Sequence, residues 1–228
     1  VTSMQLKEIA KIYTGFPEKF GIPRQSGLVE GLTGTIIFHP EYRNPDAVRG
    51  MSDFSHLWLI WGFSKAKKDN WAATVAPPRL GGRIRMGVFA TRSPFRPNAL
   101  GLSSVRLESV AIDEKLGPVI TVSGIDMLNE TPIYDIKPYL PHVDSHPDAI
   151  GGFASAVEKN LLEIRFPEGL LEKIEDCDKK TVLALLSEDP RDRFIHDENR
   201  IWGFTYRNYN IRFQVQDSVL TVREVQLL

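Results

Sequence analysis

The apolar positions in the first 140 residues fall into short runs separated by Gly and Pro, a pattern typical of strands and turns. Residues 56–63 form a continuous apolar run, which predicts a strand buried on both faces. Residues 83–90 begin by alternating basic and apolar side chains, which predicts a half-exposed strand. Further strands are predicted at residues 33–39, 104–112, 118–125 and 133–136. So many short strands favour a sheet closed into a barrel.

A helical turn is predicted at residues 45–51, where Asn44 is a candidate cap and Pro45 occupies the first position. The pattern changes after a Pro/Gly/Asp-rich stretch at residues 141–152, which is typical of a linker. Beyond it we predict a strand, a short helix and a three-stranded meander, at residues 161–166, 180–187, 201–206, 211–215 and 220–225. The predicted fold is mainly β, with an N-terminal β-barrel domain (residues 1–150) and a small C-terminal α+β domain (residues 151–228).

Composition narrows the class of protein. The 228 residues are enough to bury a core without the help of disulfides or metals. The 28 Lys+Arg and 29 Asp+Glu leave a net charge of −1. Cys177 is the one cysteine, which excludes an intrachain disulfide and fits a cytoplasmic protein. No apolar run reaches the length of about 18–20 residues that spans a bilayer, and no signal sequence opens the chain. We therefore expect no membrane partner.

The charge is unevenly distributed. Between Arg79 and Arg106 there are six arginines and no acidic residue, whereas residues 158–198 carry twelve acidic and seven basic side chains. Within the basic stretch, Pro94 and Pro97 stiffen a loop that presents Ser93, two arginines and Asn98, a suitable platform for anions. The alternative is a surface turn with solvated arginines. A locally positive face keeps RNA among the possible partners despite the neutral total.

Asp135, Lys137 and Tyr139 stand at alternate positions after a short apolar segment. In extended chain they point the same way, because side chains alternate with a period of two. A carboxylate, an ammonium and a phenol on one face could act as a general base or orient a substrate. The alternative is an ordinary edge strand with a local ion pair.

Other polar groups carry less information. The loop at residues 22–28 resembles many surface turns, and His56 opens an apolar strand as core histidines often do. His142, Asp144 and His146 offer three metal ligands, but their spacing matches no defined zinc pattern, so we expect no metal. The chain has no Rossmann glycine fingerprint, no P-loop and no Gly-x-Ser-x-Gly elbow, which disfavours nucleotide enzymes of those kinds and serine hydrolases.

Several segments in order carry a family resemblance. They are Pro23-Arg24-Gln25 with Gly27-Leu28, Gly50 with Ser55-His56-Leu57-Trp58, Pro78-Arg79-Leu80-Gly81-Gly82, Gly87-Val88-Phe89-Ala90-Thr91-Arg92-Ser93 with Arg96-Pro97-Asn98, Asp135-Ile136-Lys137-Pro138-Tyr139-Leu140-Pro141 and Glu188-Asp189-Pro190-Arg191. Together they resemble the YaeB/TsaA-like family of tRNA N6-threonylcarbamoyladenosine methyltransferases over nearly the whole chain. Ala99 departs from the family pattern, which has a proline after Asn98, and this changes loop stiffness without touching a polar group.

The resemblance implies an enzyme that uses S-adenosyl-L-methionine on a β-barrel and works as a homodimer. It implies methylation of the hypermodified adenosine at position 37, in the anticodon loop of threonine tRNA, with the C-terminal domain assisting tRNA binding. The implied cofactor-binding residues are Gln25, Ser26, Gly27, Leu28, Ser64, Lys65, Arg92, Leu102, Ser123, Gly124, Ile125 and Asp126. The implied substrate-binding residues are Arg96, Asn98 and Arg191, and Asp135, Lys137 and Tyr139 are implied as catalytic.

The chemistry suggests roles for the last three. The target nitrogen is urea-like and a poor nucleophile, so positioning and removal of its proton would both help. We hypothesise that Asp135 or Tyr139 takes that proton while Lys137 and an arginine hold negative charge; Tyr139 could equally stack on the base. Two alternatives stay open from the residues alone: a non-catalytic RNA-binding module, and a metal-dependent hydrolase using His142, Asp144 and His146.

Overall fold

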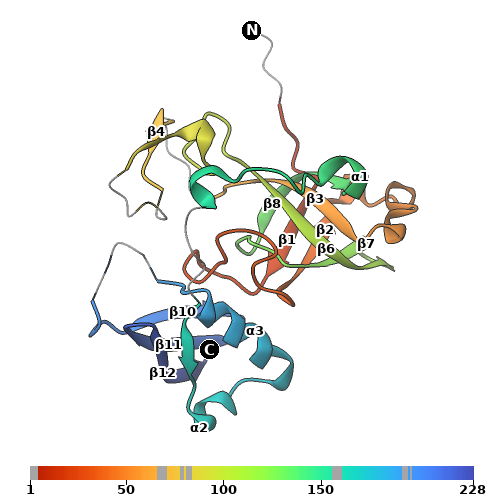
Figure 1. Cartoon of the computed structure of the whole chain (residues 1–228). Coiled ribbons are helices and arrows are strands. Elements are labelled where there is room, and N and C mark those ends of the chain that lie inside the picture. Colours follow the sequence, from red (N-terminus) through yellow and green to blue (C-terminus); the bar gives the residue numbers. More distant parts are fainter. Residues whose placement is uncertain are drawn as a thin grey trace.

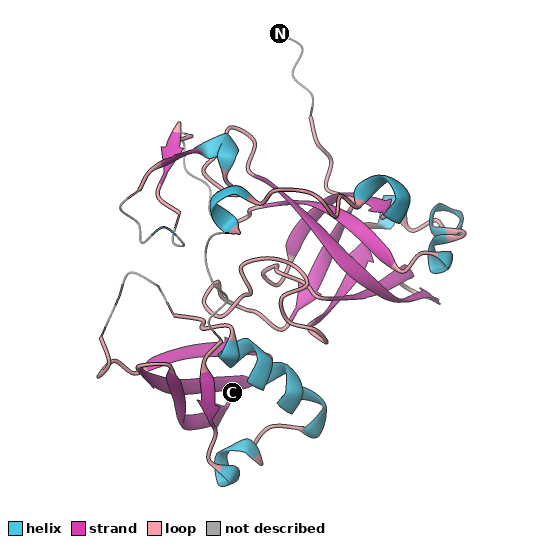
Figure 2. Ribbon diagram, in the orientation of Figure 1, coloured by secondary structure: helices cyan, strands magenta, loops and turns pink. Residues whose placement is uncertain are grey.

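Six strands close into an antiparallel barrel, and a separate four-stranded sheet with a helix beside it follows in the chain (Figures 1 and 2). The computed structural model describes residues 5–65, 71–77, 80, 84–155, 161–191, 195 and 197–228. The barrel strands are β1 (Ala10–Thr14), β2 (Thr33–Phe38), β3 (His56–Gly62), β6 (Leu100–Asp113), β7 (Gly117–Ser123) and β8 (Thr131–Pro138). They pair in the order β1-β2-β7-β6-β3-β8, and β8 pairs with β1 to close the barrel. The predicted mainly β fold with an N-terminal barrel is confirmed.

Strand β3 corrects one prediction. Leu57 and Leu59 are fully buried in the barrel, whereas Trp58 and Ile60 point outward and stay partly exposed. The apolar run is therefore buried on one face only. A closed barrel has one core, and the outward side chains of β3 are covered only in part by β6, β8 and a short helix, α1 (Pro141–Asp144).

The basic stretch also differs from its prediction. Residues 84–90 contain only a two-residue strand, β5 (Met86–Gly87), paired with β4 (Thr74–Val75), and the chain then turns into a 3-10 helix at Val88–Ala90. The ladder is short because Val88 leaves it and is buried under that turn. Arg79, Arg83 and His196 lie outside the described residues.

The expected helical turn after Asn44 is present as 3-10 turns at Pro45–Val48 and Met51–Asp53, and the Asn44 side chain accepts a hydrogen bond from the Asp46 amide at 3.0 Å. The predicted meander is also present, as β10 (Trp202–Tyr206), β11 (Tyr209–Gln216) and β12 (Val219–Leu227). Strand β9 (Glu163–Arg165) joins β12 in parallel, and α2 (Glu168–Leu171) and α3 (Asp176–Ser187) complete the part. Its core packs Val182 and Leu186 of α3 with Phe204 and Phe213 of the sheet, all fully buried.

The chain between β1 and β2 lies between the barrel and the C-terminal sheet (Figure 1). Phe16 packs against Tyr206 with ring centroids 5.3 Å apart, and the amide of Arg207 donates to the carbonyl of Gly15 at 2.6 Å. A Cβ at Gly15 would lie 2.6 Å from the Tyr206 ring, so this close approach requires glycine. The two parts therefore share one continuous apolar core. Among the described residues, no helix combines the length and the hydropathy needed to cross a membrane.

Candidate active site

Two of the predicted segments, residues 25–28 and 123–126, lie against each other at one end of the barrel; we call them the glycine junction. The amide of Gly27 donates to the carbonyl of Gly124 at 2.8 Å. Both glycines have positive φ, +76° and +73°, and a Cβ at Gly124 would lie 3.4 Å from the Gly27 backbone. Only glycine adopts this conformation without strain, and the space above Gly27 is open. Gly27 is exposed while Gly124 is buried beneath it, so a ligand can approach the Gly27 backbone closely.

Asp126 is the polar centre of the glycine junction. Its Oδ1 accepts a hydrogen bond from Ser103 Oγ at 2.7 Å, and the Ser103 hydroxyl accepts one from Trp61 Nε1 at 3.0 Å. Burial raises the pKa of the Asp126 carboxyl, and the bonds from Ser103 and from the Ser26 amide, with the positive charge of Arg92, partly oppose that rise. Arg92 in turn donates to the side-chain oxygen of Gln25. The carboxylate is therefore a partly desolvated acceptor, suited to an amine or hydroxyl donor.

A second group lies on the outward side of strands β3 and β8; we call it the outer face. In the β3–β8 ladder Asp135 stands opposite Ile60 and Lys137 opposite Trp58, so both charged side chains point outward. Lys137 Nζ lies 3.0 Å from Asp135 Oδ2, and the two side chains are 62% and 45% exposed. An ion pair this exposed adds little stability, but it fixes the direction of the carboxylate.

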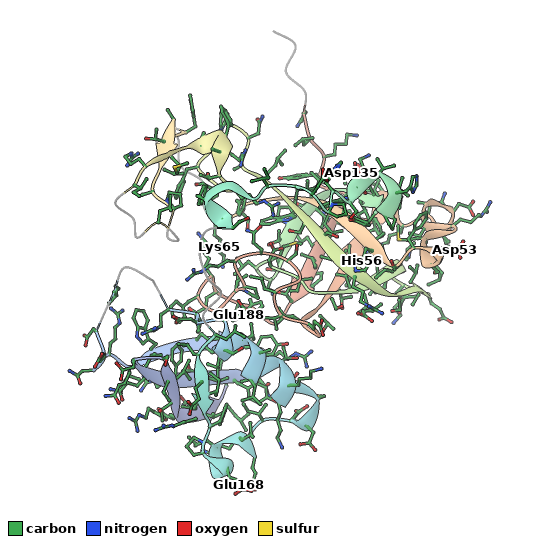
Figure 3. The ribbon with its side chains drawn as sticks, viewed as in Figure 1. Asp53, His56, Lys65, Asp135, Glu168 and Glu188 are labelled. Atoms are coloured by element: carbon green, nitrogen blue, oxygen red, sulfur yellow. The ribbon has the colours of Figure 1, made fainter. Side chains whose placement is uncertain are left out.

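Aromatic rings flank this ion pair. The amide of Tyr139 donates to the carbonyl of His56 at 3.0 Å, and the Tyr139 ring lies 5.6 Å from the ring of Trp58 and 6.1 Å from that of His56. Figure 3 shows Asp135 and His56 on the barrel. A carboxylate, an ammonium and three rings thus share one surface, as the period-two spacing predicted for Asp135, Lys137 and Tyr139.

Asp144 borders the outer face and holds one of its rings. Its Oδ2 accepts hydrogen bonds from Trp58 Nε1 and from the Leu140 amide, each at 2.9 Å. These two bonds, the Leu140 amide first, hold the pKa of Asp144 below its usual value. Asp144, considered in the sequence as a metal ligand with His142 and His146, thus orients Trp58. In the described part of the chain the group of side chains that meets metal-ligand spacing is a different one, Glu175, Cys177 and Asp178.

Leu102 of β6 also belongs to the outer face, and lies on the opposite side of β3 from β8. It pairs with Ile60, is 56% exposed, and lies two strand spacings, about 10 Å, from Asp135. Its neighbour Ser103 points inward to Asp126, so β6 connects the outer face with the glycine junction. Ser64 and Lys65, just after β3, are exposed, and the Lys65 carbonyl accepts a hydrogen bond from Lys19. In Figure 3 Lys65 lies toward the C-terminal sheet and Asp135 away from it.

The predicted substrate-binding residues occupy two places. Arg96 and Asn98 lie in the loop before β6, where Arg96 Nη1 donates to the Thr91 carbonyl at 3.1 Å and the Asn98 carbonyl accepts from the Leu100 amide at 2.8 Å. Arg191 comes from the C-terminal part, and its carbonyl accepts from Arg24 Nη2 at 3.3 Å, next to the glycine junction. The Arg191 guanidinium itself makes a paired contact with Asp189, at 2.8 and 2.9 Å.

Sequence reasoning missed three supporting residues: Ser103, Trp58 and Asp144. Ser103 reaches Asp126 across 23 positions and Trp58 reaches Asp144 across 86, so only the strand pairing brings them together. Burial alternates along β3, and Trp58 is at an outward position. That position would have marked Trp58 as a candidate, but the uninterrupted apolar run did not show which residues point outward.

Comparisons with known proteins identify the family of the chain. The profile of the tRNA-methyltransferase O N-terminal domain matches residues 11–145. The chain is 36% identical over 228 residues to the tRNA (adenine(37)-N6)-methyltransferase of Escherichia coli K12, covering 96% of each. It is 45% identical over 159 residues to the putative S-adenosylmethionine-dependent methyltransferase RcsF of Pseudomonas aeruginosa, covering 70% of this chain and 64% of that protein. The crystal structure of TrmO from P. aeruginosa superposes with a TM-score of 0.81 at 28% identity, covering 100% of this chain and 99% of that one. The resemblance found in the sequence is thereby confirmed, and the chain belongs to the tRNA-methyltransferase O family.

Proposed function

We propose that this protein is an S-adenosyl-L-methionine-dependent tRNA methyltransferase that methylates N6 of threonylcarbamoyladenosine at position 37 of threonine tRNA. The observation that carries the proposal is the similarity to the E. coli tRNA (adenine(37)-N6)-methyltransferase over 96% of both chains. The glycine junction and the outer face supply the two kinds of site that such a transfer needs. The threonylcarbamoyl group and the threonine tRNA come from the family resemblance.

The glycine junction is the proposed cofactor site. When bound there, S-adenosyl-L-methionine supplies an electrophilic methyl group. The backbone around Gly27 is open to a ligand, and the Asp126 carboxylate is an acceptor for an amine or ribose hydroxyl. Arg92, held by Gln25, keeps positive charge beside that carboxylate. Leu102, on the outward side of β6, is proposed as an apolar contact for the part of the cofactor that extends toward the outer face. Ser64 and Lys65 complete the proposed set from the turn after β3.

The outer face is the proposed site for the target base. Tyr139 and Trp58 offer ring faces on which an unpaired RNA base can stack. As the new N–C bond forms, the bond between the methyl carbon and the sulfonium sulfur breaks and leaves a neutral thioether. The N6 proton passes to the Asp135 carboxylate or to Tyr139, and Lys137 at 3.0 Å stabilises the negative charge on Asp135 before transfer. Arg96, Asn98 and Arg191 are proposed to hold the threonine carboxylate and nearby phosphates, the anions that guanidinium groups bind best.

The family resemblance also implies roles for the two domains, a location and an assembly. The barrel domain, residues 1–150, carries the cofactor, and residues 151–228 assist tRNA binding through the segment that places Arg191 beside Arg24. We propose a cytoplasmic homodimer as the working unit. Lone, exposed Cys177 is consistent with a reducing compartment.

The experiment that tests the function is a methyl-transfer assay with labelled cofactor and threonine tRNA, prepared with and without the threonylcarbamoyl group. We expect label in the modified tRNA, and nucleoside mass spectrometry should place it on the modified adenosine. Label in neither tRNA, together with salt-dependent RNA binding, would instead indicate an RNA-binding module.

A further inference from the structure

Two large aromatic side chains are exposed on the segment that carries β4 and β5, which we call the arm (residues 71–77 and 84–99). Trp71 is 52% exposed and Phe89 is 72% exposed. Their ring centroids are 6.2 Å apart and their planes differ by 23°. The arm projects from the barrel at the upper left of Figure 1. Adjacent exposed rings of this size mark an interaction site more often than isolated surface apolar residues do.

The backbone around the two rings is fixed. The amide of Ala72, next to Trp71, donates to the Phe95 carbonyl at 3.1 Å, and the amide of Val88, next to Phe89, donates to the Ala73 carbonyl at 3.0 Å. Val88 itself is buried, so the turn that presents Phe89 is anchored from below. Because the backbone that carries the rings is already ordered, the binding of a ligand there costs less conformational entropy.

The charge of the arm selects the class of ligand. Residues 71–106 contain no acidic side chain. Arg85, whose guanidinium donates to Thr74 at 2.7 and 2.8 Å, and Arg92 and Arg96 lie on the same segment as the rings. A second copy of this chain docked arm to arm would bring arginines against arginines. A polyanion with exposed ring systems is the complementary partner, which describes single-stranded RNA.

We propose that Trp71 and Phe89 form a stacking platform for unpaired bases of the RNA loop that carries the target adenosine. The proposal rests on the proposed function and deepens it, because it adds a base-binding surface distinct from the outer face. Stacking on aromatic rings tolerates any base, so the platform contributes affinity and orientation, and the chemistry stays at Asp135 and Tyr139.

The test compares variants of the full-length protein for binding to threonylcarbamoylated threonine tRNA. We expect Trp71→Ala and Phe89→Ala each to weaken binding about 5- to 150-fold, the range found for one base–aromatic stack. Trp71→Phe and Phe89→Tyr keep a ring and should bind nearly as the parent does. The matched control is Ile84→Ala, which removes an aliphatic side chain that is 56% exposed on the same arm and should leave binding unchanged. Affinity for S-adenosyl-L-methionine should be unchanged in every variant.

Tryptophan fluorescence provides a direct readout. Stacking of a base on Trp71 quenches its emission, so the quenching seen on adding tRNA should shrink in Trp71→Phe although binding persists. Unchanged tRNA affinity in both alanine variants, with a methyl-transferring parent protein, would overturn the platform and leave the proposed function standing. A change of oligomeric state in those variants by analytical ultracentrifugation would assign the rings to a second copy. A parent protein that neither binds nor methylates tRNA would refute both proposals.

Discussion

The glycine junction and the outer face sit on one barrel but are built in opposite ways. The junction is a backbone structure, in which two glycines with positive φ pack together beside a single partly desolvated carboxylate, Asp126, at the proposed cofactor site. The outer face is a side-chain structure, in which an exposed ion pair and aromatic rings stand on a regular ladder. The first suits tight shape-dependent binding, and the second suits chemistry on a substrate that comes and goes. Substitutions should therefore separate cofactor affinity from turnover.

The largest effect is expected at the outer face. Asp135→Asn and Tyr139→Phe each remove a candidate general base. The variant that lacks the residue which takes the proton should turn over the modified tRNA about 10²-fold more slowly or worse. A smaller loss in Tyr139→Phe, which keeps the ring, would assign Tyr139 to base stacking. Single-turnover rates with saturating cofactor measure both. Glu114→Gln, an exposed carboxylate on the β6–β7 turn, serves as the control and should keep full activity. Full activity in both Asp135→Asn and Tyr139→Phe would remove the outer face from the mechanism.

The next effect is expected at Asp126. Asp126→Asn should weaken cofactor binding about 10-fold or more, since a hydrogen bond to a charged acceptor is lost. Stability should move the other way. Burial raises the pKa of this carboxyl, so its contribution to stability is complete below its ordinary pKa and is lost as the pH rises through the raised value.

At pH 7 the Asp126→Asn variant should consequently melt at the same temperature as the parent or higher, and the difference should vanish in acid, where the parent carboxyl is protonated. Calorimetry measures the binding, and thermal melts at several pH values measure the stability. A variant that melts lower at pH 7 yet binds cofactor normally would contradict the role given to Asp126.

Gly27 offers a smaller effect with a close control. Gly27→Ala places a Cβ on a residue with φ of +76°, and Gly50→Ala does the same at φ of +80° on the distant 3-10 turn, both into open space. Each should cost about 1 kcal/mol of unfolding free energy, measured by denaturant titration. Only Gly27→Ala should also weaken cofactor binding. Equal binding by the two variants would place the cofactor elsewhere.

The smallest effect is expected at Asp144, which borders the outer face. Asp144→Asn should lower turnover less than Asp135→Asn does, because it loosens Trp58 and the Leu140 amide without touching the substrate. The pKa of Asp144 is lowered, so its contribution to stability is present above its ordinary pKa and is lost as the pH falls through the lowered value. The near-ultraviolet circular dichroism of the variant should differ from that of the parent at pH 7 and approach it in strong acid. Identical spectra at neutral pH would show that Asp144 does not hold Trp58.

The sequence predicted local features well and long-range ones poorly. Asp135, Lys137 and Tyr139 could be placed on one face because alternation along a strand is a local property. The contacts of Asp126 with Ser103 and of Asp144 with Trp58 depend on which strands pair and in what register, which the chain sets through distant packing.

Short elements such as β1 were not predicted, for a related reason. Strand β1 has only five residues, of mixed polarity, and is held by pairing with β2 and β8 rather than by its own propensity. The half-buried state of β3 depended on barrel closure, because a run of apolar residues does not reveal which of them face a neighbouring segment.

The central claim, that the glycine junction binds the cofactor and the outer face performs the transfer, is tested most directly by cofactor saturation curves for methyl transfer to the modified tRNA. Asp126→Asn and Asp135→Asn form a matched pair, since each replaces one carboxylate by its amide. We predict that excess S-adenosyl-L-methionine restores the rate of Asp126→Asn toward that of the parent and leaves Asp135→Asn slow. Rescue of Asp135→Asn by cofactor, or a saturated Asp126→Asn enzyme that stays equally slow, would contradict the claim.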